Sequence, residues 1–253
     1  MKKKETVYKE YVPRDVSWMY FNRRILQEAE KKHVPLLERL SFLGIYSNNL
    51  DEFFRVRVAL LNRIAECDDK ETRNERREAI DTLKVINRLN TQYAKEYEKA
   101  IKQVSADLKD EHINLVNDEE LDDEQRHFVR NFYYKQLDGY IAPVWFSALK
   151  DLNNEPDNSI YMAVKMRRES DKTHPEYALL QLPVNLVGRF VQLPDRDGES
   201  YIMYIDDVVR CSLPLIFAGL NYNIFEAYAF KFTKDAEMEI DNDLRTGLMQ
   251  KIS

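Results

Sequence analysis

One short polar run carries the strongest candidate chemistry in this sequence. Ser47, Asn48 and Asn49 lie inside the apolar stretch FLGIYSNNLDEFFRVRVALL, residues 42–61. Ser and Asn each cost up to ~0.7 kcal/mol relative to Ala in a helix interior, because their side chains bond nearby backbone groups. Three such residues among Leu, Ile and Phe are predicted to interrupt an otherwise continuous helix, and two explanations are open.

The structural explanation is a kink or a buried polar contact that sets the helix register, since buried amides usually serve structure. The functional explanation uses the amide of Asn49 itself. An Asn side chain offers an acceptor beside a donor, which matches the N6–H donor and N7 acceptor of adenine. On a rigid helix facing a cleft, Asn49 could hold the adenine of a free nucleotide. Nearby, Arg55 has the spacing to pair with Asp51 or Glu52.

Motifs for other chemistries are absent from the sequence. It contains no GxxxxGK[ST] phosphate loop, no GxGxxG, no HExxH and no GxSxG. Cys67 and Cys211 are far apart and lack metal-ligand spacing, which suits a reducing compartment. The histidines are scattered: His33, His112, His127 and His174. The sequence therefore predicts neither a catalytic constellation nor a metal site within these residues.

Composition indicates a folded protein. Of 253 residues, 44% are hydrophobic and 32% charged, with only six Gly and eight Pro, enough for one large domain or two ordinary ones. The net charge of −6 gives no reason to expect nucleic acid as the main partner. The N-terminus has no apolar signal segment, and no apolar run approaches the ~18 residues of a membrane span. We expect a cytoplasmic protein.

Helical periodicity dominates residues 1–109. A first helix is expected over residues 15–32, a second from about Pro35 with a gap at Ser47, and a third from a Thr72 capping box to about residue 109. The predicted apolar stripe of the first helix is Trp18, Phe21, Ile25, Leu26 and Ala29. These patterns predict an all-helical N-terminal domain.

The pattern changes in residues 110–253. Asp122 is expected to start a helix that runs to about Trp145. Short β-like runs follow at 159–167, 176–183, 189–194 and 201–207, with turn signals at 153–158, 174–175 and 195–198, and a further strand within 226–240. The fold class predicted for the chain is α+β, with an all-helical domain followed by an α+β head domain that has an antiparallel sheet.

The last residues are also helical in pattern. Leu244, Leu248 and Ile252 are helically spaced, and no cap or stop signal follows them. We therefore expect a chain truncated at its C-terminus, with an incomplete head domain.

The order of residues in the first helices resembles the opening of the bacterial polyphosphate kinase family. The segments are RDVSWMYFNRRILQEA, residues 14–29, and VPLLERLSFLGIYSNNLDEFFRVRVALL, residues 34–61. They are similar to the family patterns RELSWLxFNxRVLxEA and PLxERLxFLxIxSNNLDEFFxVR. Weaker resemblance continues through 121–144, 176–194 and 227–240. Val16, where the family usually has Leu, and Trp145 are modest departures.

This resemblance implies an enzyme, an ATP-polyphosphate phosphotransferase. Such an enzyme moves the terminal phosphate of ATP reversibly onto inorganic polyphosphate through a phosphohistidine in C-terminal domains that this sequence lacks. The resemblance implies that Asn49 contacts ATP, that no catalytic residue lies in this fragment, and that Mg²⁺ acts in the full-length enzyme without a ligand here. It also implies a homo-oligomer formed through the head domain, with ATP, ADP and polyphosphate as partners.

The fragment alone is expected to be inactive. An alternative interpretation is a non-catalytic helical scaffold, a protein-interaction module in which the motif serves packing only. The rest of the reading frame separates the two, because the enzyme needs further domains that supply the phosphohistidine and phosphate-binding Arg residues.

Overall fold

The chain forms two compact units. The computed structural model describes residues 11–67, 73–149, 159–231 and 233–234. Among the described residues, one unit lies within residues 11–107 and the other within residues 108–234. The first unit is helical and the second is α+β with an antiparallel sheet, which confirms the predicted fold class.

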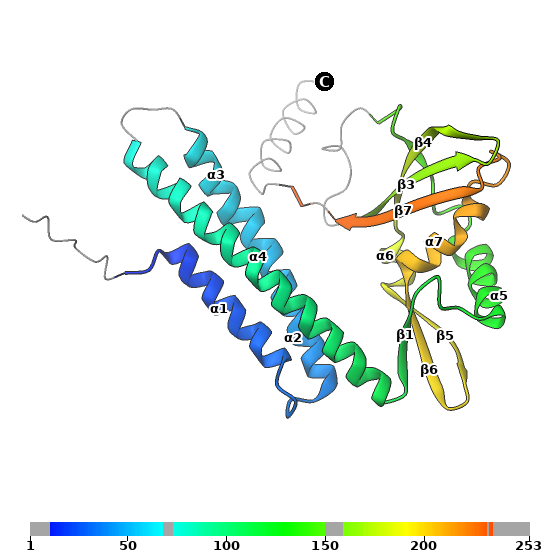
Figure 1. Ribbon diagram of the computed structural model, residues 1–253, viewed down its shortest axis with the longest axis horizontal. Helices are drawn as coiled ribbons and strands as arrows, with labels where there is room; N and C mark the ends of the chain where they lie inside the picture. The colour runs from blue at the N-terminus through cyan, green and yellow to red at the C-terminus, as the bar shows by residue number, and fades with distance from the viewer. Residues whose placement is uncertain (1–10, 68–72, 150–158, 232, 235–253) are drawn as a thin grey trace, which may run out of the picture. The chain divides into compact units, whose positions relative to one another are not determined.

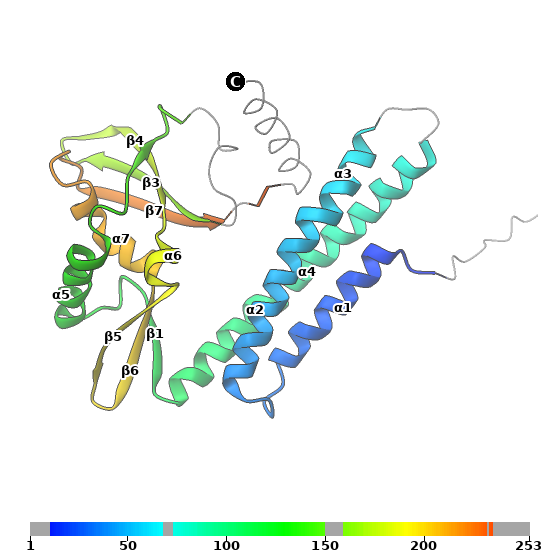
Figure 2. The same ribbon diagram turned by 180° about the vertical axis from the view of Figure 1, so that it is seen from behind.

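The helical unit is built from long helices that lie side by side (Figures 1 and 2). Its helices are α1 (Arg14–Ala29), α2 (Leu36–Phe53), α3 (Ala59–Glu66) and α4 (Arg73–Asp110), the last of which ends in the following unit. Arg23 of α1 pairs with Glu96 of α4 at 2.8 Å, and Tyr46 of α2 stacks on Tyr97 of α4. Each of α1 and α2 therefore contacts α4.

The buried stripe of α1 differs from the predicted one at Phe21. Phe21 is 55% exposed, so its expected place on the inward stripe is wrong. The buried side chains of α1 are Asp15, Val16, Met19, Asn22, Leu26 and Ala29. These positions follow the three- and four-residue steps of a helix face, and Asn22 takes a central place among them.

The polar run does not interrupt α2, so this prediction is wrong. α2 continues through Ser47, Asn48 and Asn49, and the irregularity comes later, as a π-helical turn at Phe54–Val58 that leads directly into α3. A π turn inserts an extra residue and rotates the side chains that follow it. The intrinsic helix preference of three polar residues is small against the packing of a long amphipathic helix.

The helix α4 corresponds to the third predicted helix and ends at Asp110, close to the predicted end near residue 109. It spans 38 residues, and its buried side chains are Ala79, Ile86, Leu89, Tyr93, Ala100, Val104 and Leu108. The predicted capping residue Thr72 lies outside the described residues.

In its described residues, the α+β unit contains two sheets. Its strands are β1 (Ile113–Val116), β2 (Val144–Trp145), β3 (Ile160–Arg168), β4 (Asp171–Gln181), β5 (Phe190–Arg196), β6 (Glu199–Tyr204) and β7 (Ile224–Lys231). The four-stranded sheet has the order β2-β4-β3-β7 and is antiparallel throughout. The smaller sheet has the order β1-β6-β5, and β1 pairs with β6 in parallel. That parallel pair was not predicted from the sequence.

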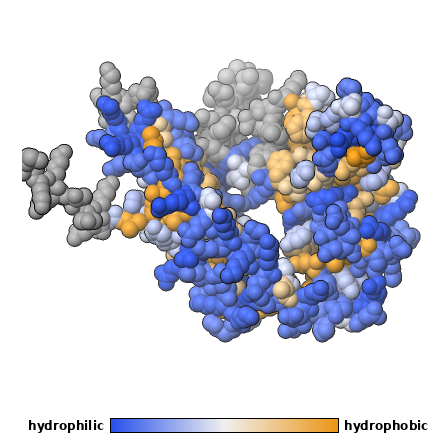
Figure 3. Space-filling model, viewed as in Figure 1, coloured by the Kyte–Doolittle hydropathy of each residue, from blue (hydrophilic) through white to orange (hydrophobic). Residues whose placement is uncertain are grey.

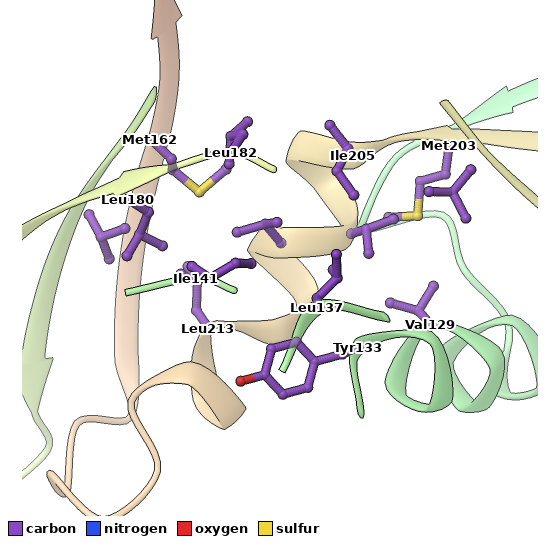
Figure 4. Packing of buried hydrophobic residues seen from close by; sticks show 14 of the residues in the cluster. Val129, Tyr133, Leu137, Ile141, Met162, Leu180, Leu182, Met203, Ile205 and Leu213 are labelled. Atoms are coloured by element: carbon purple, nitrogen blue, oxygen red, sulfur yellow. The ribbon is translucent and has the colours of Figure 1, made fainter. Parts of the chain in front are cut away.

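Helices fill the space beside the sheets. They are α5 (Asp123–Phe132), which continues into a π turn at Tyr133–Leu137, the short α6 (Val184–Val187) and α7 (Ile205–Ile216). Figure 4 shows side chains of these helices and of the strands in one hydrophobic cluster, with Met162, Leu137 and Leu213 all buried. On the face seen in Figure 3, hydrophilic residues cover most of both units, as expected for apolar residues gathered inside.

Three predicted elements differ from the structure of this unit. The helix begun at Asp122, whose capping box with Gln125 is present, ends by Leu137 instead of Trp145. Gly139 has a φ of 82°, and Pro143 disfavours helix in the residue before it, so the chain leaves the helix there.

The predicted turn at 174–175 is instead part of β4. Pro175 lies between Asp171 and Glu176, where the register with β3 is irregular, so its missing N–H costs no ladder bond. The predicted strand 201–207 ends at Tyr204, because the segment that follows is α7. The predicted turn at 153–158, the predicted C-terminal helix and most of the segment after Lys231 lie outside the described residues.

Candidate functional site

The candidate site lies along the contact between α1 and α2, where three pairs of side chains connect the two helices. Asn22 meets Asn49 and the main chain of Tyr46, Trp18 stacks on Phe53, and Asp15 pairs with Arg57. The residues of α1 and those of α2 follow steps of three or four, which places them on one face of each helix, and Arg57 lies in the π turn that continues α2. We call this row of contacts the α1–α2 ladder.

Asn49 occupies the first rung of the ladder. Its Nδ2 donates to Oδ1 of Asn22 at 3.3 Å, and Nδ2 of Asn22 donates to the carbonyl oxygen of Tyr46 at 3.1 Å. Asn22 is 1% exposed, whereas Asn49 is half-buried and its neighbour Asn48 is exposed. Within the described residues, no hydrogen bond reaches Oδ1 of Asn49. The rigid helix therefore presents one acceptor and one remaining N–H of Asn49 for a further partner.

The second rung is aromatic. The rings of Trp18 and Phe53 lie 4.0 Å apart between centroids, with an interplanar angle of 1°. Phe53 is buried and Trp18 is half-buried. Stacked aromatic pairs contribute about 0.5–1.5 kcal/mol beyond the area they bury, so this rung stiffens the helix pair next to Asn49.

The third rung is an ion pair between Asp15 of α1 and Arg57 of the π turn. Arg57 donates two hydrogen bonds to the Asp15 carboxylate, at 2.8 and 3.1 Å, and the bond to Asp15 raises the pKa of Arg57. Arg57 lies four residues after Phe53 and within the π turn Phe54–Val58. π turns occur frequently at functional sites.

Tyr46 joins the ladder to α4. Its hydroxyl is buried and has no hydrogen-bond partner among the described residues, while its ring stacks on Tyr97 at 5.3 Å. Burial raises the pKa of Tyr46 to about 12, and the nearby charge of Glu96 adds to the rise. Tyr46 is thus neutral at ordinary pH and contributes a carbonyl acceptor to Asn22.

The charged residues beside Asn49 act along their own helix. Arg55 pairs with Glu52 at 3.2 Å, one of the two spacings that the sequence predicted. Asn49 lines up with Phe53 and Arg57 of the ladder, whereas Glu52 is exposed. The face that joins α1 therefore differs from the face that carries this ion pair.

Sequence reasoning missed Asn22 as a site residue. The Phe21–Asn22 pair is part of the family pattern. The physical signal was an Asn on an apolar helix stripe, because a buried Asn needs hydrogen-bond partners. It also missed Arg39, which is 3% exposed, donates to the carbonyl of Ala29 at 2.7 Å and pairs with Asp107 at 2.5 Å. Arg39 ties the end of α1 to α4.

In the residues that the structure describes, no three His, Cys, Asp or Glu side chains gather closely enough to hold a metal ion. Nor does any helix of those residues combine the length and the apolarity needed to cross a membrane.

The site and fold define a helical unit joined to an α+β unit, and comparisons with known proteins identify the class. The sequence model of the polyphosphate kinase N-terminal domain matches residues 11–116, and that of the polyphosphate kinase middle domain matches residues 124–253. The chain belongs to the polyphosphate kinase family, as its resemblance implied.

Individual relatives agree with this assignment. Polyphosphate kinases of Vibrio parahaemolyticus and Escherichia coli are 34% and 33% identical to 96% of this chain. The crystal structure of polyphosphate kinase from Porphyromonas gingivalis superposes with a TM-score of 0.77 at 25% identity, and the match covers 89% of this chain and 33% of that one. The chain spans 35% of the length of the two sequence relatives.

Proposed function

We propose that this chain is the nucleotide-binding N-terminal part of a polyphosphate kinase. The complete enzyme transfers the terminal phosphate of ATP reversibly to inorganic polyphosphate through a phosphohistidine carried beyond these residues. The matched family and the share of the relatives' length that the chain spans support this proposal. Mg²⁺ belongs with the phosphates in the rest of the polypeptide, and the α+β unit contributes to a homo-oligomer in the cytoplasm.

Within this chain, Asn49 holds the adenine of ATP. The observation that supports this role is that Oδ1 of Asn49 accepts no hydrogen bond from the described residues, while one N–H of its Nδ2 is not used by Asn22. The α1–α2 ladder holds the helix that carries this amide. Adenine offers the complementary donor and acceptor. A base held at this point is bound and oriented while its phosphates react elsewhere.

The hydrogen bond between Asn49 and Asn22 also favours a second function, that of a packing residue in a helical scaffold. The two functions differ in what the amide does for the nucleotide. A packing residue affects the free energy of unfolding, whereas an adenine contact affects ATP binding as well.

The test is Asn49→Ala in the full-length protein. Loss of the base contact costs about 1–3 kcal/mol of binding by analogy with bidentate base contacts, so the KM for ATP rises roughly tenfold or more. Because adenine is remote from the reacting phosphate, kcat changes less. Asn48→Ala is the matched control, since Asn48 is exposed one position away. A folded Asn49→Ala enzyme with an unchanged KM for ATP assigns Asn49 to packing.

A further inference from the structure

The orientation of the Asn49 amide is determined by the main chain. A backbone carbonyl oxygen can only accept hydrogen bonds. Asn22 therefore turns its Nδ2 toward the carbonyl of Tyr46, at 3.1 Å, and its Oδ1 is left to accept. Asn49 must then donate its Nδ2 to that oxygen, at 3.3 Å. The three groups form a relay with one direction, from the Tyr46 carbonyl through Asn22 to Asn49.

Turning either amide over breaks this relay. A reversed Asn49 would set its Oδ1 against Oδ1 of Asn22, two acceptors with no hydrogen between them. A reversed Asn22 would set its Oδ1 against the Tyr46 carbonyl in the same way. Because Asn22 is 1% exposed, water does not compensate for the lost bond, and a buried unpaired amide is expensive. Asn49 is thereby held in one of its two amide orientations.

The held orientation has a chemical consequence. The two polar atoms of a planar amide point in different directions, so a side chain that directs Nδ2 at Asn22 directs Oδ1 elsewhere. The described residues send no hydrogen bond to that oxygen. Asn49 thus presents its Oδ1 as an acceptor to a partner. An exocyclic amino group of a base can donate a hydrogen bond to this oxygen. A carbonyl at the same position of the base would place two acceptor oxygens against each other.

We propose that Asn22 is a positioning residue that makes the nucleotide site select a 6-amino purine over a 6-oxo purine. The inference rests on the proposed adenine contact of Asn49 and adds to it the source of its specificity. Asn22 does not touch the nucleotide; it acts through the amide of Asn49.

The test compares ATP with inosine triphosphate, which carries a carbonyl where ATP carries the amino group, in the full-length enzyme. In the native protein the KM for inosine triphosphate should exceed that for ATP by about tenfold, the effect of one unmatched hydrogen bond. Asn22→Leu, which is similar in size and cannot hydrogen-bond, frees Asn49 to turn over. The KM ratio of the two nucleotides should then fall to within about threefold.

Two further variants separate positioning from stability. Asn22→Asp keeps an acceptor facing Asn49 but loses the donor to Tyr46, so it should lower Tm while the KM ratio stays near the native value. Leu26→Ala removes a buried side chain one turn away on α1, so it should lower Tm and leave the KM ratio unchanged. If Asn22→Leu does not fold, Asn22→Ala takes its place.

The outcomes distinguish this inference from the proposed function. If Asn49→Ala leaves the KM for ATP unchanged, the adenine contact is wrong and the selection by Asn22 falls with it. If Asn49→Ala raises that KM but folded Asn22→Leu keeps the native KM ratio, the adenine contact stands and the role of Asn22 is wrong. A KM ratio that falls in Asn22→Leu, and not in Leu26→Ala or Asn22→Asp, supports the inference.

Discussion

At the scale of single residues, the helical unit combines satisfied and unsatisfied polar groups within one turn of α2. The amides of Asn22 and Asn49 are linked to each other and to a main-chain carbonyl. The hydroxyl of Tyr46, buried beside them, has no partner among the described residues. A buried hydroxyl without a hydrogen bond destabilises the folded state, whereas the carbonyl of the same residue serves the relay. The ring and the main-chain carbonyl of Tyr46 therefore stabilise the folded state, whereas its hydroxyl destabilises it.

Tyr46→Phe should stabilise the protein by about 1 kcal/mol, because it removes an unsatisfied buried hydroxyl and keeps the stacked ring. The variant also tests the raised pKa. An unfolded Tyr ionises near pH 10 and the folded Tyr46 near pH 12, so native Tyr46 reduces stability progressively as the pH rises from 10 toward 12.

Denaturant unfolding at pH 7 and at pH 10 to 11 measures both effects. The gain from Tyr46→Phe should be larger at the alkaline pH. Tyr20→Phe is the control, since Tyr20 is 45% exposed on α1 and should change little at either pH. A loss of stability in Tyr46→Phe at pH 7 would show that the hydroxyl has a partner after all.

At the scale of elements, the π turn determines how the end of α2 meets α1. The turn Phe54–Val58 adds a residue to the helix and follows directly on Phe53, which stacks on Trp18. Arg57 in the turn then reaches Asp15, at the opposite end of the ladder from Asn49. The ladder thus has a polar rung at each end and an aromatic rung between them, and each end orients the two helices.

Arg57→Ala should destabilise the protein by about 2 kcal/mol. The Asp15 carboxylate is only 12% exposed, and without Arg57 it loses two charge-assisted hydrogen bonds. Lys84→Ala is the matched control, because the side chains of Lys84 and Asp81 are 70% and 62% exposed and such pairs contribute within ~0.5 kcal/mol. Unfolding in urea measures both variants. Equal effects of the two substitutions would show that the third rung contributes no more than a surface pair.

At the scale of the whole molecule, the chain corresponds to one part of the longer sequences of its relatives. It spans 35% of the length of its sequence relatives and matches the family's N-terminal and middle domains. The described residues include Asn49, which we propose contacts adenine, and no group of three His, Cys, Asp or Glu side chains close enough to hold a metal ion. We propose that nucleotide binding and phosphoryl transfer take place in different parts of the polypeptide.

Purified residues 1–253 should therefore show no polyphosphate synthesis from ATP. The measurement is incorporation of the terminal phosphate of ATP into polymer, with the full-length protein as the positive control. Phosphoryl transfer needs a nucleophile held in line with the phosphate and charges that stabilise it, which we place outside this chain. Robust synthesis by residues 1–253 alone would contradict the proposed division of the enzyme.

The sequence by itself determined the broad architecture. Apolar residues that recur at steps of three and four indicate a helix, and apolar residues that alternate with polar ones indicate a strand. Each pattern shows which side of the element is buried. Helical residues before 109 and the strands β3, β4 and β5 follow from such patterns, and the capping box at Asp122 marks its helix start. The unusual residue order around Asn49 also indicated the family.

Only the tertiary structure decided which side chains meet. Asn22 and Asn49 lie 27 positions apart, and no local pattern states that their amides share a hydrogen bond. The same holds for the parallel pairing of β1 with β6, which depends on where distant segments pack. Local preference also predicted a break at Ser47 where α2 is continuous, because its contacts with α1 and α4 outweigh a few tenths of a kcal/mol of helix propensity per residue. Long-range packing therefore determined the ladder, the relay and the orientation of Asn49.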